Sequence, residues 1–232
     1  MQTNTDNNLI SFDAIFHAFK FTHGVEQCLQ SINEFHPSAS IYIGVDGDGE
    51  YDKFVENASK YNIKKVVKYE ENILPKARFD KPTSPKIYCN RILSLISLCT
   101  KKWIMLLEDD VRVVKSITEL PTTDAGGPHG HALSEDLVFN IEHYTKQKLQ
   151  NSNYGFCGGT IFKADIFNGL QLNKLNFEQL IKLDDRIGVA TDICLTTLTY
   201  LNKKTYSHWI EYGELNNPSE ANEHCSVLHN VK

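Results

Sequence analysis

WIMLLEDDVRV, residues 103–113, is the most informative stretch of the chain, because five apolar residues run directly into three carboxylates. A continuous apolar run of this kind is typical of a parallel strand that helices cover on both faces. Glu108, Asp109 and Asp110 follow at its carboxyl end. Three adjacent carboxylates beside a buried strand are costly to desolvate unless water, a partner or a cation compensates them. The stretch therefore predicts a central strand and, next to it, a site that calls for positive charge.

The segments around this stretch alternate between strand and helix patterns. Strands are expected at 10–17, 40–45, 64–71, 103–107, about 154–164 and 205–212, and helices at 22–35, 51–62, 84–100, about 134–147, 175–183 and 192–202. Thr22 and Ser84 suit helix N-caps, and Pro85 suits a first helical position. Residues 119–136 are rich in turn formers and are expected to form a long loop. Strands that alternate with helices predict an α/β fold with a mostly parallel central sheet flanked by helices.

Bulk properties narrow the class of protein. A chain of 232 residues with 41% hydrophobic residues is expected to form one domain. Its net charge of -5 gives no basic excess for a phosphate backbone, so nucleic acid is not an expected partner. The polar N-terminus is not that of a signal peptide, and no 18-residue apolar run predicts a transmembrane segment, so a soluble, cytoplasmic protein is expected. Six scattered cysteines without a C-x-x-C pair predict free, mostly buried thiols.

The acidic triplet predicts a cation site. In open α/β sheets, ligands bind beyond the carboxyl ends of the parallel strands, which is where Glu108, Asp109 and Asp110 are expected. Mg²⁺ or Mn²⁺ typically binds through one or two carboxylates and completes its coordination shell with substrate phosphate oxygens. The pattern therefore predicts a metal-bridged diphosphate. The alternative is a solvated acidic turn that holds no ion.

The order of these motifs resembles that of a known enzyme family. An acidic triplet after an apolar fourth strand is similar to the D-x-D motif of GT-A-fold glycosyltransferases, which use nucleotide sugars. The later CGGTIFKADIF (157–167) and TDICL (191–195) resemble, in order and spacing, the glycine-containing strand and the Asp-led helix of the acceptor side in that family. The resemblance implies one GT-A-like domain over 1–232, with a nucleotide-sugar-binding half at about 9–115 and a smaller acceptor-binding half and tail at about 116–232. A small virus-encoded member is one possibility that it leaves open.

The resemblance also implies roles for residues of the donor pocket. These residues are His17, Ala18 and Phe19 at the nucleobase, Asp46 at the base or ribose, and Glu108 and Asp109 at the ribose and neighbouring donor groups. Arg91 falls off the apolar stripe of its helix, so its guanidinium can point toward the nucleotide. Gly158 and Gly159 would let backbone approach the donor sugar or the acceptor. Each has a simpler alternative. The aromatic residues can be core residues, Asp46 can serve a tight turn, Arg91 can be a solvated helix residue, and the glycines can form a turn.

For the chemistry, the resemblance implies that Asp110 and, near the C-terminus, His229 bind Mn²⁺ or Mg²⁺, with Lys232 as a further phosphate contact. A frayed terminus is the alternative for this tail. Asp192 is the candidate base that would deprotonate an acceptor hydroxyl, with Asp184 and Asp185 as further candidates, and its alternative is a helix N-terminal charge. The resulting expectation is a hexosyl- or pentosyltransferase that moves a sugar from a UDP-linked donor to a glycan, glycoprotein or other hydroxyl acceptor, with inversion favoured over retention. A non-catalytic nucleotide-sugar or carbohydrate-binding module and a nucleotidyltransferase are the competing hypotheses.

Overall fold

A seven-stranded sheet with the order β10-β6-β9-β4-β1-β2-β3 forms the centre of the molecule in the computed structural model. The structure describes residues 10–73, 85–188, 191–215 and 222–231. The strands of the sheet are β1 (Phe12–Ala18), β2 (Ser40–Val45), β3 (Ile63–Lys68), β4 (Trp103–Leu107), β6 (Ala125–Gly127), β9 (Ile161–Lys163) and β10 (Tyr206–His208). Neighbouring strands pair in parallel except at β9, which is antiparallel to both β4 and β6. The expected α/β class with a mostly parallel central sheet is confirmed.

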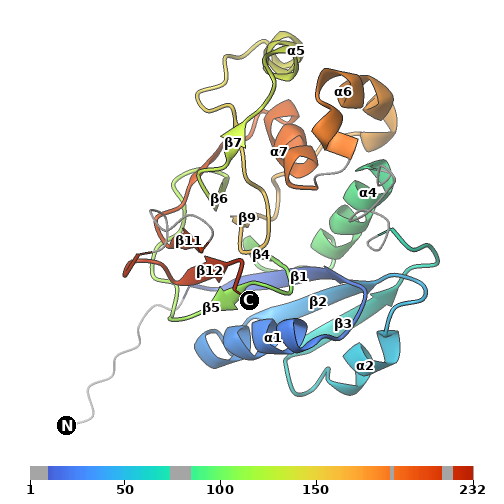
Figure 1. Cartoon of the computed structure of the whole chain (residues 1–232), viewed down its shortest axis with the longest axis vertical. Helices are drawn as coiled ribbons and strands as arrows, with labels where there is room; N and C mark the ends of the chain where they lie inside the picture. The colour runs from blue at the N-terminus through green and yellow to red at the C-terminus, as the bar shows by residue number, and fades with distance from the viewer. Residues whose placement is uncertain (1–9, 74–84, 189–190, 216–221, 232) are drawn as a thin grey trace.

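Helices cover both faces of this sheet (Figure 1). They are α1 (His23–Phe35), α2 (Tyr51–Glu56), α4 (Pro85–Ile96), α5 (Glu135–Thr145), α6 (Phe177–Leu183) and α7 (Thr191–Leu201), with the short 3-10 turns η1 (Leu172–Lys174) and η2 (Asp185–Gly188). In β4, Ile104 and Leu106 belong to the core under α4 to α7, while Met105 and Leu107 belong to the core under α1. Because strand side chains alternate between faces, an apolar run such as β4 is buried on both sides.

Local signals set most helix starts as expected. Thr22 accepts a hydrogen bond from the Val25 N–H and caps α1, and Ser134 caps α5 in the same way through the Leu137 N–H. Pro85 is the first residue of α4, where its missing N–H costs nothing; Ser84 lies outside the described residues. The helix expected at 51–62 is shorter, because α2 ends at Glu56 and turns follow it.

Three predictions for the second half were wrong. Residues 119–136 are not only loop, because β6 pairs with β9 and β10 inside the central sheet, and β7 (His131–Ala132) pairs with β8 (Asn153–Tyr154). The glycines of β6 give no strand pattern in the sequence. They are required by packing, because a Cβ on Gly126 would lie 2.8 Å from Trp209 Cβ. The single strand expected at 205–212 is two strands, β10 and β11 (Tyr212–Glu214), in different sheets. The single strand expected at about 154–164 is likewise divided between β8 and β9, which also belong to different sheets.

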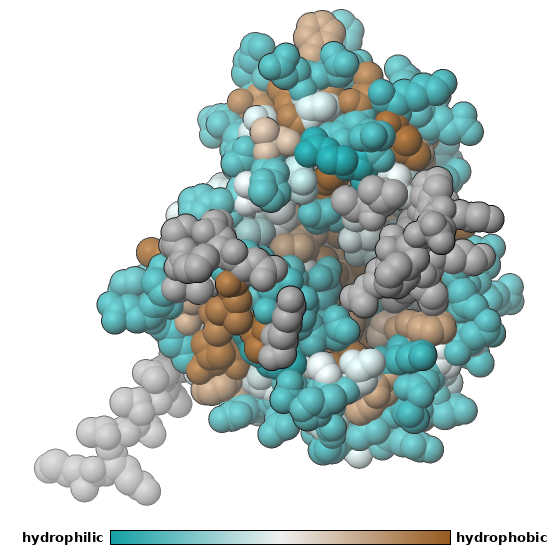
Figure 2. Space-filling model, in the orientation of Figure 1, coloured by the Kyte–Doolittle hydropathy of each residue, from teal (hydrophilic) through white to brown (hydrophobic). Residues whose placement is uncertain are grey.

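A small three-stranded sheet brings the C-terminal segment to the acidic triplet. In it, β12 (Val227–His229) lies between β11, to which it is parallel, and β5 (Arg112–Val113), to which it is antiparallel. The expected alternative of a frayed tail therefore does not hold for residues 222–231. Figure 2 shows a largely hydrophilic face, with a strip of hydrophobic side chains over the region of this small sheet.

None of the six cysteines, all of which lie in the described residues, forms a disulfide, as expected, and four of them are buried. Among residues 10–73, 85–188, 191–215 and 222–231, no helix combines the length and the apolar character that crossing a membrane requires.

Candidate metal and donor site

The acidic triplet forms a tight turn between β4 and β5. The Val111 N–H donates to the Glu108 carbonyl at 3.2 Å, and Val111 itself is fully buried, which anchors the turn to the core. The turn lies at the carboxyl end of β4, next to the same end of the parallel strand β1. This is the edge of an open α/β sheet where ligands bind, because loops and helix N-termini converge there.

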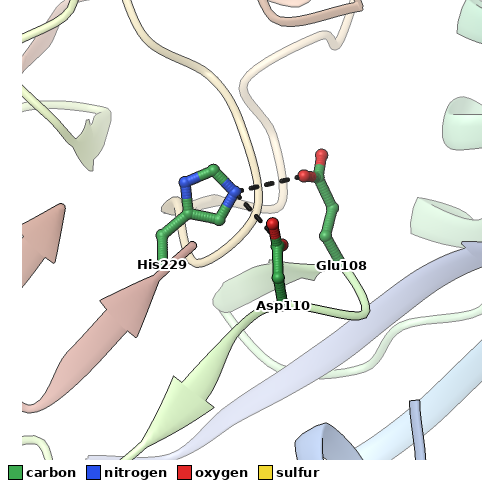
Figure 3. A group of neighbouring side chains, drawn as sticks. All are labelled: Glu108, Asp110 and His229. Carbon is green, nitrogen blue, oxygen red and sulfur yellow. Dashed lines mark hydrogen bonds and ion pairs between the residues drawn. The ribbon is translucent and has the colours of Figure 1, made fainter. Parts of the chain in front are cut away.

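Glu108, Asp110 and His229 point toward one another across this edge (Figure 3). His229 Nε2 lies 3.3 Å from Glu108 Oε2 and 3.3 Å from Asp110 Oδ1. Each residue offers one ligand atom, and these atoms all lie within 4.8 Å of one another. The carboxylate side chains are about one-third exposed, at 38% and 34%, whereas the imidazole is 10% exposed. His229 is therefore buried in the protein, while solvent reaches the site from the side of the two carboxylates.

The tail is fixed to this turn by main-chain bonds as well. The Val231 N–H donates to the Asp110 carbonyl at 3.0 Å, and the Val114 N–H donates to the Ser226 carbonyl at 2.9 Å. Because hydrogen bonds flank β12 at both ends, His229 has a defined place opposite the carboxylates. Lys232, the expected phosphate contact, lies outside the described residues.

Three carboxylates contact the imidazole of His229. Its Nδ1 lies 2.7 Å from Glu214 Oε2, and Asn230 Nδ2 donates to the other oxygen of Glu214. Burial alone would lower the pKa of His229, but contacts with Asp110, Cys157, Glu108 and Glu214 outweigh burial and raise this pKa well above its ordinary value. A positive charge between the carboxylates is thus strongly favoured, whether a proton or a cation supplies it.

The donor set fits a divalent cation. Two carboxylate oxygens and one imidazole nitrogen, with no sulfur, are ligands that Mn²⁺ accepts readily, and Mg²⁺ also prefers carboxylate oxygens. Three protein ligands leave coordination positions for phosphate oxygens of a ligand. Glu108, which was expected at the donor ribose, belongs to this group, while Asp109 is not part of it.

Gly158 and Gly159 form a turn packed directly on the site. A Cβ on Gly158 would lie 2.7 Å from Glu108 Cβ, so glycine lets the Glu108 side chain pass. Gly159 has φ +84°, and a Cβ there would lie 2.8 Å from Val227 Cγ1 in β12. The Gly159 N–H donates to the Leu106 carbonyl of β4 at 2.7 Å. These contacts favour the turn alternative for both glycines, because the turn supports the Glu108 side chain and the strand that carries His229.

Three of the expected donor-pocket residues meet in a buried cluster. Asp46 is fully buried, and its Oδ1 contacts both His17 Nε2, at 2.7 Å, and an Arg91 guanidinium nitrogen. Its Oδ2 accepts the Ile73 N–H at 2.7 Å. Burial lowers the pKa of His17, and the nearby Asp46 carboxylate only partly offsets this effect. Both Asp46 oxygens are thus engaged within the protein, which favours a structural role at the end of β2.

Arg91 was expected to lie off the apolar stripe of its helix, but it is only 5% exposed, so the solvated alternative is wrong. Its second guanidinium nitrogen donates to the Glu71 carbonyl at 2.8 Å, and its Cζ lies 4.5 Å from the centre of the Tyr69 ring. A buried arginine is stable only when carboxylate and carbonyl acceptors surround it in this way. Arg91 therefore ties α4 to the ends of β2 and β3.

The remaining expected donor residues lie just at or beyond the carboxyl ends of β1 and β4. Ala18 is buried at the end of β1, where its carbonyl accepts the Asp46 N–H, and Phe19 is half-buried just beyond. The Asp109 carbonyl accepts an Arg112 N–H at 3.0 Å, and Gly24 of α1 packs closely against that carbonyl.

Asp192 lies at the first turn of α7, half-buried. Its Oδ1 accepts the Ile193 N–H at 2.9 Å, which is the expected helix N-terminal contact. Burial raises the pKa of Asp192, and the charge of Glu108 raises it further. A carboxylate with a raised pKa is suited to general-base work.

Asp184, a further candidate base, has a different environment. It is 4% exposed and accepts two hydrogen bonds from the Arg186 guanidinium, at 2.8 and 2.6 Å. Burial would raise its pKa, but the Arg186 bonds and a backbone bond from Ser134 lower it on balance. Such a carboxylate is a weak proton acceptor, so Asp192 is the better candidate.

Sequence reasoning missed Glu214, Asn230 and Tyr212 of the small sheet. Tyr212 donates to the Gly158 carbonyl at 3.0 Å and supports the glycine turn. The signal for Glu214 and Tyr212 in the sequence is a short polar-aromatic segment, EYGEL (211–215), which lies close to the tail in the chain but shows no periodicity. Only the strand register reveals that Glu214 pairs with His229.

Comparisons with known proteins identify the fold. No protein-family model matches the chain, and no curated protein matches its sequence. Among solved structures, the galactosyltransferase LgtC in complex with donor and acceptor sugar analogs is 16% identical over 95% of this chain and 87% of its own, with a TM-score of 0.58. The apo form of the glycosyltransferase GlyE of Streptococcus pneumoniae is 13% identical over 95% of this chain, with a TM-score of 0.53. The chain spans 55% of GlyE. At such identities the likeness shows a shared fold, the GT-A-like arrangement that the sequence led us to expect.

Proposed function

We propose that a protein with this fold and this acidic site is a metal-dependent glycosyltransferase that moves a sugar from a UDP-linked donor to a hydroxyl acceptor. The observation that carries the proposal is the convergence of Glu108, Asp110 and His229 at the carboxyl end of β4. The chain would act as a hexosyl- or pentosyltransferase on a glycan, glycoprotein or other hydroxyl acceptor.

Each part of the site has a role in this proposal. Glu108, Asp110 and His229 would hold Mn²⁺ or Mg²⁺, and a bound cation would neutralise the negative charge of the diphosphate leaving group. Glu108 and Asp110 are open to solvent, so a diphosphate can reach that side of the site. The nucleoside would lie toward the ends of β1 and β2, near Phe19, since these strands end at the same edge of the sheet.

Asp192 would remove the proton of the acceptor hydroxyl during direct, inverting transfer. Its raised pKa makes it a better base than an ordinary carboxylate, and the charge of Glu108 contributes to that rise. An anomeric assignment of the product by NMR tests this role. A product that retains the donor configuration would remove Asp192 from the role of simple base.

Calorimetric titration tests the proposal. Nucleoside diphosphates and UDP-sugars are titrated with and without Mn²⁺ into the wild type, Asp110→Ala, and Asp165→Asn as a charge control, because Asp165 is an exposed carboxylate paired with Lys204. We expect one nucleotide to bind the wild type only with Mn²⁺. Its affinity should fall at least tenfold in Asp110→Ala and stay unchanged in Asp165→Asn. If no nucleotide binds the wild type in either condition, the proposal fails. Metal-dependent binding without turnover would identify a binding module instead.

A further inference from the structure

We infer that Glu214 is a positioning residue for His229 and thereby sets the preference of the site for Mn²⁺ over Mg²⁺. This inference rests on the proposed metal site. It adds a residue that contacts His229 but is not one of the three proposed metal ligands. Glu214 Oε2 lies 2.7 Å from His229 Nδ1, whereas the carboxylates of the site face Nε2, on the other side of the ring.

Strand register produces this contact. The parallel pairing of β11 with β12 places Glu214 directly opposite His229. The Leu215 N–H donates to the His229 carbonyl at 3.1 Å, which locks that register. The Glu214 side chain is 16% exposed and the His229 side chain 10%, so little water competes for the contact. The orientation of the imidazole is therefore a property of the small sheet.

Glu214 is itself held in place. Asn230 adopts a left-handed backbone conformation with φ 60°, and its Nδ2 donates to Glu214 Oε1. Asparagine tolerates this conformation better than most residues do, which suits it to a position directly after the strand. With one oxygen bound by Asn230, the other is directed at the imidazole.

The chemical consequence concerns the tautomer of His229. When a cation replaces the proton on Nε2, a carboxylate beside Nδ1 keeps the remaining proton on Nδ1, so the Nε2 lone pair would be directed at the cation beside Glu108 and Asp110. A carboxylate on the far side of a ligating imidazole fixes the ring and raises its basicity. Loss of such a partner typically lowers metal affinity by about 10- to 100-fold. The affinity for Mn²⁺ should fall more than the affinity for Mg²⁺, because Mg²⁺ prefers oxygen ligands and retains several waters.

Metal binding without substrate tests the inference. Mn²⁺ is titrated into the metal-free protein and followed by the electron paramagnetic resonance signal of the free ion, and Mg²⁺ affinity is obtained by competition. The variants are Glu214→Leu, which removes the acceptor; Glu214→Gln, which keeps an acceptor oxygen without the charge; and His229→Ala. Glu223→Gln is the charge control, because Glu223 is 90% exposed and lies in the same tail.

We expect Glu214→Leu to lose about 10- to 100-fold in Mn²⁺ affinity, Glu214→Gln to lose less, and the ratio of Mn²⁺ to Mg²⁺ affinity to fall in both. Glu223→Gln should match the wild type. If Mn²⁺ affinity in Glu214→Leu stays within twofold of the wild type while His229→Ala loses at least tenfold, the inference is wrong and the proposed function stands. Equal losses of affinity for Mn²⁺ and for Mg²⁺ in the Glu214 variants would also overturn the inference, because equal losses are what a purely structural role of Glu214 predicts. A wild type that binds no Mn²⁺, with or without UDP, would overturn the inference together with the proposed function.

Discussion

A buried histidine can accept a hydrogen bond that depends on its protonation state. His36 is an example outside the candidate site: it is 2% exposed, and its Nε2 accepts the Ile117 N–H at 3.0 Å. A protonated ring could not accept that bond, since both of its nitrogens would be donors. Burial lowers the pKa of His36 to about 4, although the charge of Glu211 opposes this shift.

His36 predicts a stability change at acid pH. Its folded-state pKa of about 4 lies below the ordinary value of 6.5, so the unfolded chain binds more protons between these values. The free energy of unfolding should therefore fall as the pH drops from about 7 to 4, by about 3 kcal/mol from this group, and should not change through it above that range. Urea unfolding at several pH values measures the slope.

The matched variant is His36→Gln, which keeps an acceptor for the Ile117 N–H and cannot titrate. The acid slope of this variant should be shallower than that of the wild type by the His36 contribution. Identical slopes in the two proteins would show that His36 is not responsible.

At the scale of elements, the buried Asp46 cluster joins β1, β2 and α4. Asp46 follows β2, His17 belongs to β1 and Arg91 to α4, and all three side chains are buried. The two strand ends and the helix are thus held in fixed positions beside the edge where the nucleoside is proposed to lie. A cluster of this kind is sensitive to the loss of one partner, because the others remain buried without compensation.

We predict that Asp46→Asn lowers the free energy of unfolding by about 3–5 kcal/mol, because it leaves Arg91 without its counter-charge. The double variant Asp46→Asn with Arg91→Met should cost less than the sum of the two single changes, which is the signature of direct coupling. Urea unfolding of the four proteins completes the cycle. A cost below about 1 kcal/mol for Asp46→Asn would instead favour the expectation that Asp46 serves the nucleotide.

Much of the element pattern was predictable from local sequence. The strands β2 and β4 and the cap of α1 follow from apolar runs and from Thr22, because such signals act over a few residues. The strand β6 was not predictable, because its sequence AGG has no strand propensity and it exists only through its pairing with β9 and β10.

At the scale of the whole molecule, the candidate metal group links distant parts of the chain. Glu108 and His229 are 121 residues apart in sequence, and their side chains meet across the turn after β4. A ligand that binds the folded state alone stabilises it by mass action, so a bound cation would hold the small sheet against the large one.

We predict that Mn²⁺ at about 100 times its dissociation constant raises the free energy of unfolding of the wild type by about 2.7 kcal/mol and that chelation reverses the effect. Amide hydrogen exchange in β12 should slow at the same time. His229→Ala should show neither response. If Mn²⁺ stabilises His229→Ala as much as the wild type, the cation binds elsewhere.

The sequence alone determined the α/β class and the position of the acidic triplet at a strand end, since these depend on residue type and on patterns over a few positions. The family resemblance added Asp110 and His229 as candidate metal ligands. The tertiary structure alone decided that Glu108 joins the group, that Asp46 and Arg91 are buried partners of each other, and that Glu214 lies behind His229. These contacts depend on which distant strands pair and in which register, and no local pattern in a single sequence encodes that pairing.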